Sequence, residues 1–403
     1  MIDGSSSHHR PVMSTAKATL VASVMTALGP ISLSLYTPAM PTLAAAFGST
    51  LAAVKLTMSL YFVGFSVSQL ICGPLSDAFG RRPIKIVFLS LYLAASILAT
   101  FAHSIEVLMV ARLIQGIGAA AGIAVARAMV RDLFVGQESA RVMNAIGIFL
   151  AIGPAVSPTL GGLMLQLFDW RAIFELMVGY GLAVVLMVIF LVPETNRAPQ
   201  IAHAHPAELV RVYASLLADR RFIFPGVTLG MSVGGIYTLA TILPFVLIDK
   251  VGLSPTLFGY SMMIQTCSYI LGGLVVRQFL KLATAARLVL PGLILCLVAG
   301  AAFIIDHAAF PPSVLSVMLP VAVFAFGIAF VTPSLTTDAL APFAETAGAA
   351  SALLGFCQMG GGLLGSLVAA LFPDATLALA VVLPAMMAIA AIAHALGNAK
   401  PAG

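Results

Sequence analysis

Two polar side chains interrupt an apolar stretch of the sequence where charge is not expected. Arg112 and Gln115 stand three residues apart in a largely apolar run over 106–130. A guanidinium inside a membrane helix costs about 2.5–3.5 kcal/mol on insertion scales, so such an arginine normally faces a cavity or a partner. The alternative is that Arg112, about six residues into the helix, reaches the nearer interface, roughly 9 Å away.

A second polar cluster lies in the turn over 73–83, between two apolar stretches. A carboxylate here can face a helix N-terminus or a guanidinium, and its glycines permit a sharp turn and a close helix approach. The alternative is a group of charges that only sets the orientation in the membrane. The residues at issue are Gly73, Asp77, Gly80, Arg81 and Arg82.

Composition excludes most other kinds of chemistry. The hydrophobic residue types make up 61% of 403 residues, charged residues only 9%, and the mean hydropathy is +1.08. A soluble enzyme this apolar could not cover its surface with polar groups. The four cysteines lie in apolar runs, which excludes a disulfide scaffold. No Walker motif, zinc spacing or nucleophile elbow occurs, so we expect neither an enzyme, nor a metal site, nor a cofactor.

The elements that must position these residues are membrane helices. The apolar runs are continuous and do not alternate with period two, so a β-barrel is excluded. A spanning helix needs about 20 apolar residues. The sequence predicts twelve, over 18–40, 54–76, 84–102, 106–130, 142–167, 171–192, 222–248, 254–276, 287–305, 313–335, 346–371 and 375–396.

The twelve stretches fall into two halves. Pro41 and Gly48 in the first half recur as Pro244 and Gly252, about 200 residues later. We therefore predict an all-α membrane protein of two pseudo-symmetric six-helix bundles. Its predicted parts are a tail over 1–17, a first bundle over 18–193, a linker over 194–220 and a second bundle over 221–398.

Positive charge predicts the orientation. Only Lys55, Arg171 and Lys250 of the 20 lysines and arginines fall in the predicted outer loops, and most of the others fall in inner ones. Both termini are thus expected in the cytoplasm. This bias accounts for the pI of about 9.1, so no nucleic-acid surface is needed.

The motifs together resemble the major facilitator superfamily. The 73–83 turn resembles its motif A, and Arg112 with Gln115 resembles the arginine motif of its fourth helix. The glycine-proline motif of the fifth helix in antiporters is matched by Gly147, Gly153, Pro154, Pro158, Gly161 and Gly162. The Bcr/CflA drug-export branch is matched by the segments 36–41, 126–133, 170–174 and 193–195.

The resemblance implies a secondary exporter of small organic compounds in the inner membrane, which works by alternating access and proton antiport. Arg112 would couple transport to protons or organise the cavity, and the helix-five motif would seal the contact between the halves. Asp77 would cap the helix that starts near 347–350, and Arg81 would pair with Asp132, both in the outward-facing state. A cavity at the midplane would be lined by Tyr36, Ser32, Gln115, Tyr237, Thr241 and Thr332. We expect a monomer in the lipid bilayer.

One position departs from the family pattern. Many relatives carry an acid in the first helix, where this chain has Ser34, and the first helix contains no aspartate or glutamate. Glu106, Glu175 and Asp338 lie near the predicted interfaces. The proton carrier is therefore not identified. An uncoupled facilitator or importer of a metabolite, and a membrane scaffold or receptor on the same fold, stay open as alternatives.

Overall fold

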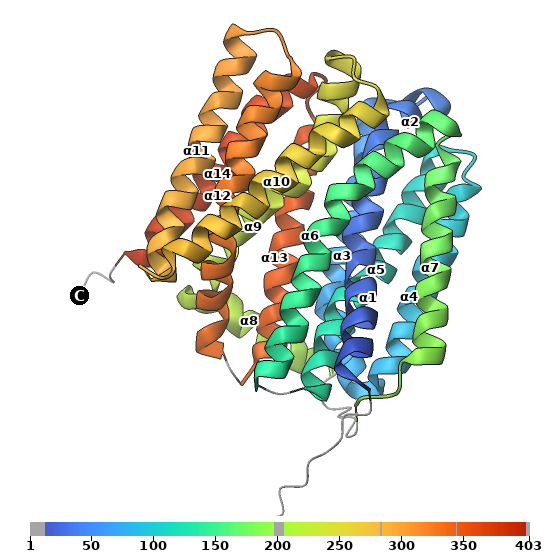
Figure 1. Ribbon diagram of the computed structural model, residues 1–403, viewed down its shortest axis with the longest axis vertical. Helices are drawn as coiled ribbons and strands as arrows, with labels where there is room; N and C mark the ends of the chain where they lie inside the picture. Colours follow the sequence, from blue (N-terminus) through green and yellow to red (C-terminus); the bar gives the residue numbers. More distant parts are fainter. Residues whose placement is uncertain (1–12, 135, 197–204, 283, 344, 400–403) are drawn as a thin grey trace, which may run out of the picture.

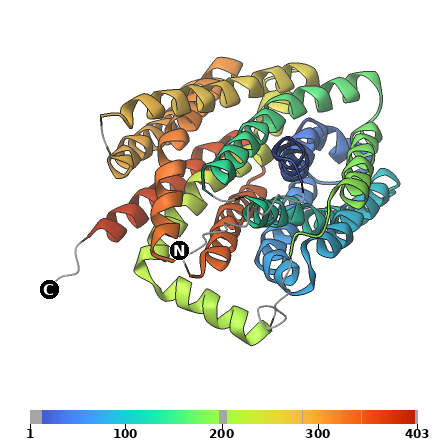
Figure 2. The same ribbon diagram turned by 60° about the horizontal axis from the view of Figure 1, so that its bottom comes forward.

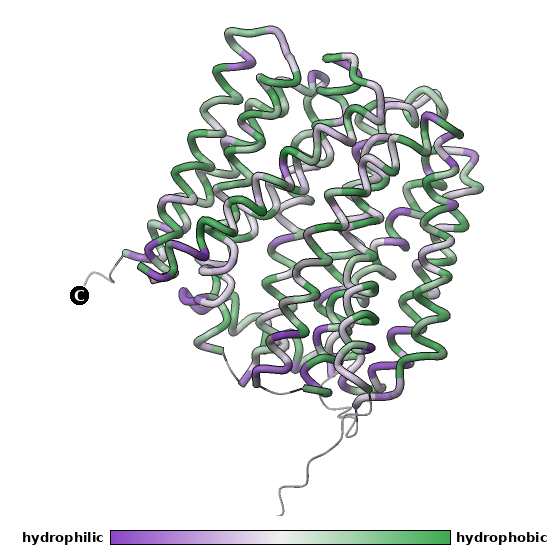
Figure 3. Tube along the Cα trace, viewed as in Figure 1, coloured by the Kyte–Doolittle hydropathy of each residue, from purple (hydrophilic) through white to green (hydrophobic). Residues whose placement is uncertain are grey.

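The protein is a bundle of long helices. The computed structural model describes residues 13–134, 136–196, 205–282, 284–343 and 345–399. Within them, twelve helices are long and apolar enough to cross a membrane, as the sequence predicts. Apolar residues dominate along the helices, and hydrophilic residues gather at their ends (Figure 3).

The first half holds six of the spans. Its elements are α1 (Thr15–Tyr36), η1 (Thr37–Ala39), α2 (Met40–Ala46), α3 (Leu51–Phe79), α4 (Arg81–Thr100), α5 (Ile105–Leu133), α6 (Gly136–Leu167) and α7 (Arg171–Leu191). Two of the turns that precede helices are fixed by side-chain caps. Thr50 accepts a hydrogen bond from the backbone at the start of α3, and Ser104 does the same for α5.

The second half repeats this plan after one extra helix. Its elements are α8 (Pro206–Ala218), α9 (Arg220–Pro244), η3 (Phe245–Lys250), α10 (Pro255–Phe279), α11 (Ala285–Ala309), α12 (Val314–Leu340), η4 (Ala341–Phe343), α13 (Ala347–Ala370) and α14 (Ala375–Asn398). The predicted linker over 194–220 thus contains a helix, because residues 206–218 form an amphipathic segment that packs on α9 and α13. The predicted tail ends earlier than expected, since α1 begins at Thr15.

The packing inside the two halves is equivalent. In the first half α1 packs on α6, α3 on α5, and α4 on α5 and α7. In the second half α9 packs on α13, α10 on α12, and α11 on α12 and α14. These are the same pairs of positions in the order of spans. The faint repeat in the sequence therefore corresponds to two pseudo-symmetric bundles (Figure 2).

The halves meet along two pairs of helices, α3 with α13 and α6 with α10. Because the number of spans is even, α1 begins and α14 ends at the same face, in the lower part of Figure 1. We call this face, marked by Thr15 and Asn398, the terminal face, and the opposite one the distal face. In Figure 1, α6 and α10 cross near the distal face and separate toward the terminal face.

Two lysines lie elsewhere than the sequence predicts. Lys55 was expected in an outer loop and Lys85 in an inner loop. Both lie within helices, at 1% and 0% exposure. The helices α3 and α4 begin before these lysines, and each ammonium group finds an acceptor inside the protein. The ammonium of Lys85 donates to the sulfur of Met129 at 3.0 Å.

Candidate functional site

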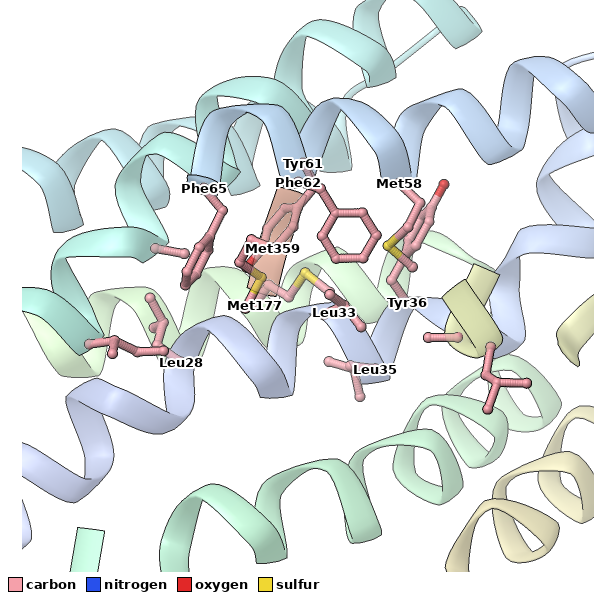
Figure 4. Close-up of a cluster of buried hydrophobic side chains, with 14 of the residues drawn as sticks. Leu28, Leu33, Leu35, Tyr36, Met58, Tyr61, Phe62, Phe65, Met177 and Met359 are labelled. Carbon is pink, nitrogen blue, oxygen red and sulfur yellow. The ribbon is translucent and has the colours of Figure 1, made fainter. Parts of the chain in front are cut away.

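Arg112 lies at the centre of the first bundle and is completely buried. Its guanidinium carbon is 4.4 Å from the ring centroid of Tyr36 on α1 and 4.3 Å from that of Tyr61 on α3. A cation held between two aromatic faces is stabilised by the ring quadrupoles, by about 2 kcal/mol or more per ring when water is excluded. Figure 4 shows both tyrosines with Met58 between α1 and α3. The alternative that Arg112 reaches the interface is wrong.

Hydrogen bonds continue the shell around Arg112. Its Nη1 donates to the side-chain oxygen of Gln115, whose amide nitrogen donates to Ser96 at 2.8 Å. The spacing of three residues places both polar groups on one face of α5. Tyr36 shares a hydrogen bond of 2.6 Å with Thr57, so its hydroxyl is also satisfied. Every direct partner of the guanidinium is neutral.

The Arg112 shell contains no carboxylate. Among the described residues Arg112 takes part in no ion pair, and its Nε has no hydrogen-bond partner. The buried polar residues of the described part include no aspartate or glutamate. Glu106 and Glu175 are exposed. Among the described residues, the site thus holds a desolvated positive charge balanced by two aromatic rings, one amide and the sulfur of Met58.

Several residues expected to line a cavity are instead packed inside the bundles. Tyr36, Ser32 and Gln115 are 0% exposed, and Ser34 is 8% exposed. Ser32 is hydrogen-bonded to Tyr92, which is itself completely buried.

The second half contributes one partly exposed ring and further packed hydroxyls. Tyr237 is half-buried and lies against Phe62 of the first half, with ring centroids 5.6 Å apart. Thr241 is buried and shares a hydrogen bond with Ser366 at 2.7 Å, whereas Thr332 donates to a carbonyl of its own helix. Of the predicted cavity residues, Tyr237 is thus the one that lies where the two halves face each other.

The 73–83 turn is held by the side chain of Arg81, which is 8% exposed. Its Nε donates to Asp132 at the end of α5 at 2.8 Å, and its Nη1 donates to Ser76 at 2.7 Å and forms an ion pair with Asp77. The expected contact with Asp132 is therefore present. It joins α4 to α5 within one half, so the expectation that it belongs to one state of the halves has no geometric basis.

Two expectations about this turn differ from the structure. The carboxylate of Asp77 pairs with Arg81, and the N-terminus of α13 receives no side-chain cap. The predicted cap is thus not formed in this conformation. Gly73 was expected to permit a close helix approach, but no atom lies within 4 Å of the position of an added Cβ. Gly73 is therefore not at a close helix approach in this conformation, although its neighbours Cys72 and Pro74 are buried.

Glu194 is the residue of this region that sequence reasoning missed. Its carboxylate accepts hydrogen bonds from the backbone N–H groups of Arg81 and Arg82, at 2.9 and 3.0 Å, and so caps the N-terminus of α4. Gly80 has a φ of 98°, and an added Cβ would lie 2.7 Å from Glu194 Oε2. Glycine is therefore required at position 80 for two reasons, namely its positive φ and the space that the carboxylate of Glu194 occupies.

The helix-five motif lies where α6 passes between α1 and α10. Gly161 touches the carbonyl of Leu35 on α1, and Gly162 lies against Pro255 on α10. A Cβ on Gly162 would be 2.5 Å from the carbonyl carbon of Pro255. The four other members of the motif precede these glycines on the same helix, namely Gly147, Gly153, Pro154 and Pro158. The motif thus lies at the contact between the two halves.

The comparison with known families decides the identity of this architecture. The family model of the Major Facilitator Superfamily matches residues 22–366. The chain belongs to the Major Facilitator Superfamily. It is a membrane transporter and not an enzyme, and its motifs are those of this superfamily.

Superfamily members with drug-resistance names are among its relatives. Multidrug resistance protein D of Escherichia coli is 30% identical over 356 residues, which cover 86% of this chain and 87% of that protein. The bicyclomycin resistance protein homolog of Haemophilus influenzae is 25% identical over 385 residues, or 93% and 94% of the two chains. The predicted resemblance to the Bcr/CflA branch is thereby confirmed.

Solved superfamily structures share the fold. A bacterial homologue of the human lysosomal transporter Spinster, solved in an inward-facing and unoccupied conformation, has a TM-score of 0.70 at 15% identity, covering 95% of this chain and 96% of that one. The human organic anion transporter MFSD10 has a TM-score of 0.64 at 16% identity, covering 96% and 100%. At these identities the likeness establishes the fold alone.

Replacing Glu194 by glutamine is expected to destabilise the motif A turn of this superfamily member by about 0.5–2 kcal/mol, the usual range for a lost cap. Partial burial raises the pKa of Glu194. Hydrogen bonds from the backbone N–H groups of residues 81, 82, 195 and 196 lower it by more, so the net pKa lies below its ordinary value. The stabilisation is therefore complete above the ordinary pKa of about 4.3 and is lost as the pH falls through the lowered value. Thermal unfolding in detergent at several pH values measures this difference.

Replacing Gly162 by valine is expected to hold the distal face open, because the side chain needs the space of the Pro255 backbone. Transport should fall by roughly 5- to 150-fold, since overpacking typically costs about 1–3 kcal/mol and each 1.4 kcal/mol is a factor of ten. Gly273→Val on α10, the other helix of this crossing, is the matched control, because nothing lies within 4 Å of its added Cβ. Equal transport rates in the two variants would contradict a role for this crossing.

Proposed function

We propose that the chain is a secondary active exporter of small, drug-like organic compounds across the cytoplasmic membrane. It works by alternating access, with the proton gradient as the driving force. The observation that carries the proposal is the similarity, over most of both chains, to proteins named for multidrug and bicyclomycin resistance. In this proposal the bundles over 18–193 and 221–398 move as units, and the chain acts as a monomer.

The charge distribution supports a cytoplasmic terminal face. Arg82, Arg131 and Arg141 lie at the terminal-face ends of helices, whereas Arg171 and Lys250 lie at the distal face. This is the bias expected when the termini are inside. In this proposal the conformation corresponds to the inward-facing state, and the separation of the helices α6 and α10 toward the terminal face supports this (Figure 1).

Fewer observations support proton antiport than support export. Arg112 resembles the coupling arginine of the family, and a buried cation disfavours protonation of its surroundings. The absence of a buried acid in the described part favours the second candidate, an uncoupled facilitator or importer. If protons are coupled, the carrier is either the substrate itself or an acid that becomes enclosed in another conformation.

The surroundings of Tyr237 support neutral or anionic aromatic substrates over cationic ones. Tyr237 packs against Phe62, with the two rings tilted by 53°, where the halves face each other. Arg127 on α5 is exposed, interacts electrostatically with Tyr237 and Arg131, and has no ion-pair partner in the described part. Aromatic surface with few polar groups suits amphipathic compounds, and the free guanidinium repels cations.

Growth of a drug-hypersensitive strain that expresses the chain tests the export of such compounds. The panel consists of pairs of toxic aromatic compounds that differ in charge. We expect increased resistance to some neutral or acidic members and none to the matched cations. No change in resistance to any compound, with the protein present in the membrane, would contradict the proposal.

A further inference from the structure

A lysine is buried where the two halves meet at the distal face. Lys55 lies one turn inside α3 and is 1% exposed. A lysine is almost never fully buried unless its charge has partners, because the ammonium loses its hydration. No carboxylate of the described residues forms an ion pair with it. Its partners must therefore be of another kind.

The partners of Lys55 are two backbone carbonyl groups of the other half, one in the last turn of α13 and one in the loop just after it. Its Nζ donates to the carbonyl oxygen of Ala369 at 3.2 Å and to that of Phe372 at 3.4 Å. It also lies 5.4 Å from the ring centroid of Phe245, again in the second half. All three contacts cross from the first bundle to the second.

The chemistry of this contact is that of a helix C-terminus. The helix α13 ends at Ala370, so its last carbonyls have no partner within the helix and carry the negative end of the helix dipole. An ammonium group is the natural ligand for that end. Asp374 follows this helix end closely. Hydrogen bonds, first of all that from Thr376, lower the pKa of its carboxyl group to about 2. That carboxylate forms its ion pair with Lys250, at 3.3 Å, and not with Lys55.

We propose that Lys55 is the distal gate of the transporter: its ammonium holds α3 of the first bundle to the C-terminus of α13 and is released to water in each cycle. The proposal deepens the alternating-access mechanism proposed above and rests on it. The same helix α13 has its N-terminus at the terminal face, where Asp77 is expected to cap it. One helix would thus be held by a cation at one end and by an anion at the other, in alternate states.

The strength of the contact suits a gate. In the open state the ammonium is hydrated, so closing the gate costs desolvation that the two carbonyls and the helix end must offset. When the lysine is absent, closure buries the Phe372 carbonyl without a donor, whereas opening hydrates it. The lysine therefore favours closure by a modest factor, about tenfold, which transport can reverse.

The test is the accessibility of a cysteine beneath the gate. Met262 of α10 is 8% exposed and lies one turn beyond Gly259, which touches α6. Met262→Cys is placed in a chain whose four native cysteines are replaced. Its alkylation by a membrane-impermeant maleimide is followed in intact cells without added compound. The rate is proportional to the population with an open distal face, even when that population is small.

We expect Lys55→Met to raise this rate about tenfold and Lys55→Arg to raise it less. Lys250→Met is the matched control, since it removes an exposed lysine from the same face, and it should leave the rate unchanged. Alkylation of Ala46→Cys, exposed at the distal face, reports access of the reagent. An unchanged or lower rate in Lys55→Met overturns the gate, as does an equal rise in Lys250→Met.

Misfolding and failure of the proposed function are separated from this outcome. A protein that unfolds would also alkylate at Cys296, which is 0% exposed and is restored singly in a parallel sample. Labelling there in the Lys55→Met background would count against the gate. The measurement needs neither substrate nor gradient. A tenfold rise in the alkylation rate without export of any compound would support the gate and contradict the proposed exporter. Export without such a rise would support the exporter and contradict the gate.

Discussion

Arg112→Ala is expected to abolish coupled transport while the protein still inserts into the membrane. The substitution removes a cation from between Tyr36 and Tyr61 and leaves Gln115 without its partner. A hydrogen bond to a charged group contributes about 1.5–3 kcal/mol, so one such loss alone corresponds to roughly a 10- to 150-fold change. Transport rates in vesicles, normalised to the amount of folded protein, measure the effect.

The controls separate charge from shape. Arg112→Lys should rescue only partly, because lysine lacks the planar group that stacks on both rings. Arg171→Ala removes an arginine that stacks on Trp170 at the surface, with 46% of its side chain exposed, and should be nearly silent. Full activity of Arg112→Ala would contradict the role. So would loss of transport in Glu106→Gln or Glu175→Gln when Arg112→Ala stays active.

Asp77→Asn is expected to shift the population toward the conformation that is open at the terminal face and to slow turnover about tenfold or more. In this structure Asp77 only pairs with Arg81, and α13 is uncapped. The carboxylate is therefore available for the N-terminus of α13 when the terminal face closes. The equilibrium affinity for substrate should change little. Cysteine accessibility at terminal-face positions and the turnover rate measure the two effects.

Arg81→Ala is the companion variant for this turn. Because Arg81 joins Asp77, Asp132 and Ser76 within one half, its loss should lower stability as well as turnover. Asp77→Asn should lower turnover alone. Unchanged labelling together with unchanged turnover in Asp77→Asn would mean that the turn is only a group of orienting charges.

Local patterns in the sequence predicted the parts of the fold that depend on local chemistry. Continuous apolar runs set all twelve spans, and a spacing of three residues placed Arg112 and Gln115 on one helix face. The contact of Arg81 with Asp132 followed from the family resemblance. Each of these depends on residues near in sequence or on a motif with a known partner.

The features that were not predicted depend on contacts between segments distant in the sequence, and a local sequence pattern does not indicate such contacts. Glu194 caps a helix that begins 113 residues earlier, and Lys55 donates to a carbonyl 314 residues away. From the sequence alone, both residues are interpreted as ordinary charges in loops. A signal was nevertheless present for Lys55, because it is a charge within the first turns of an apolar helix. The burial of Tyr36 and Gln115 was missed because their partners Thr57 and Ser96 come from other helices, α3 and α4.

The central claim is that this chain moves small organic compounds outward in exchange for protons. The direct measurement is the uptake of a compound from the growth panel into everted membrane vesicles, with and without an imposed pH gradient, acid inside. We predict uptake that requires the gradient, disappears with a protonophore and is lost in Arg112→Ala. Equal uptake with and without the gradient would contradict the account and support an uncoupled facilitator.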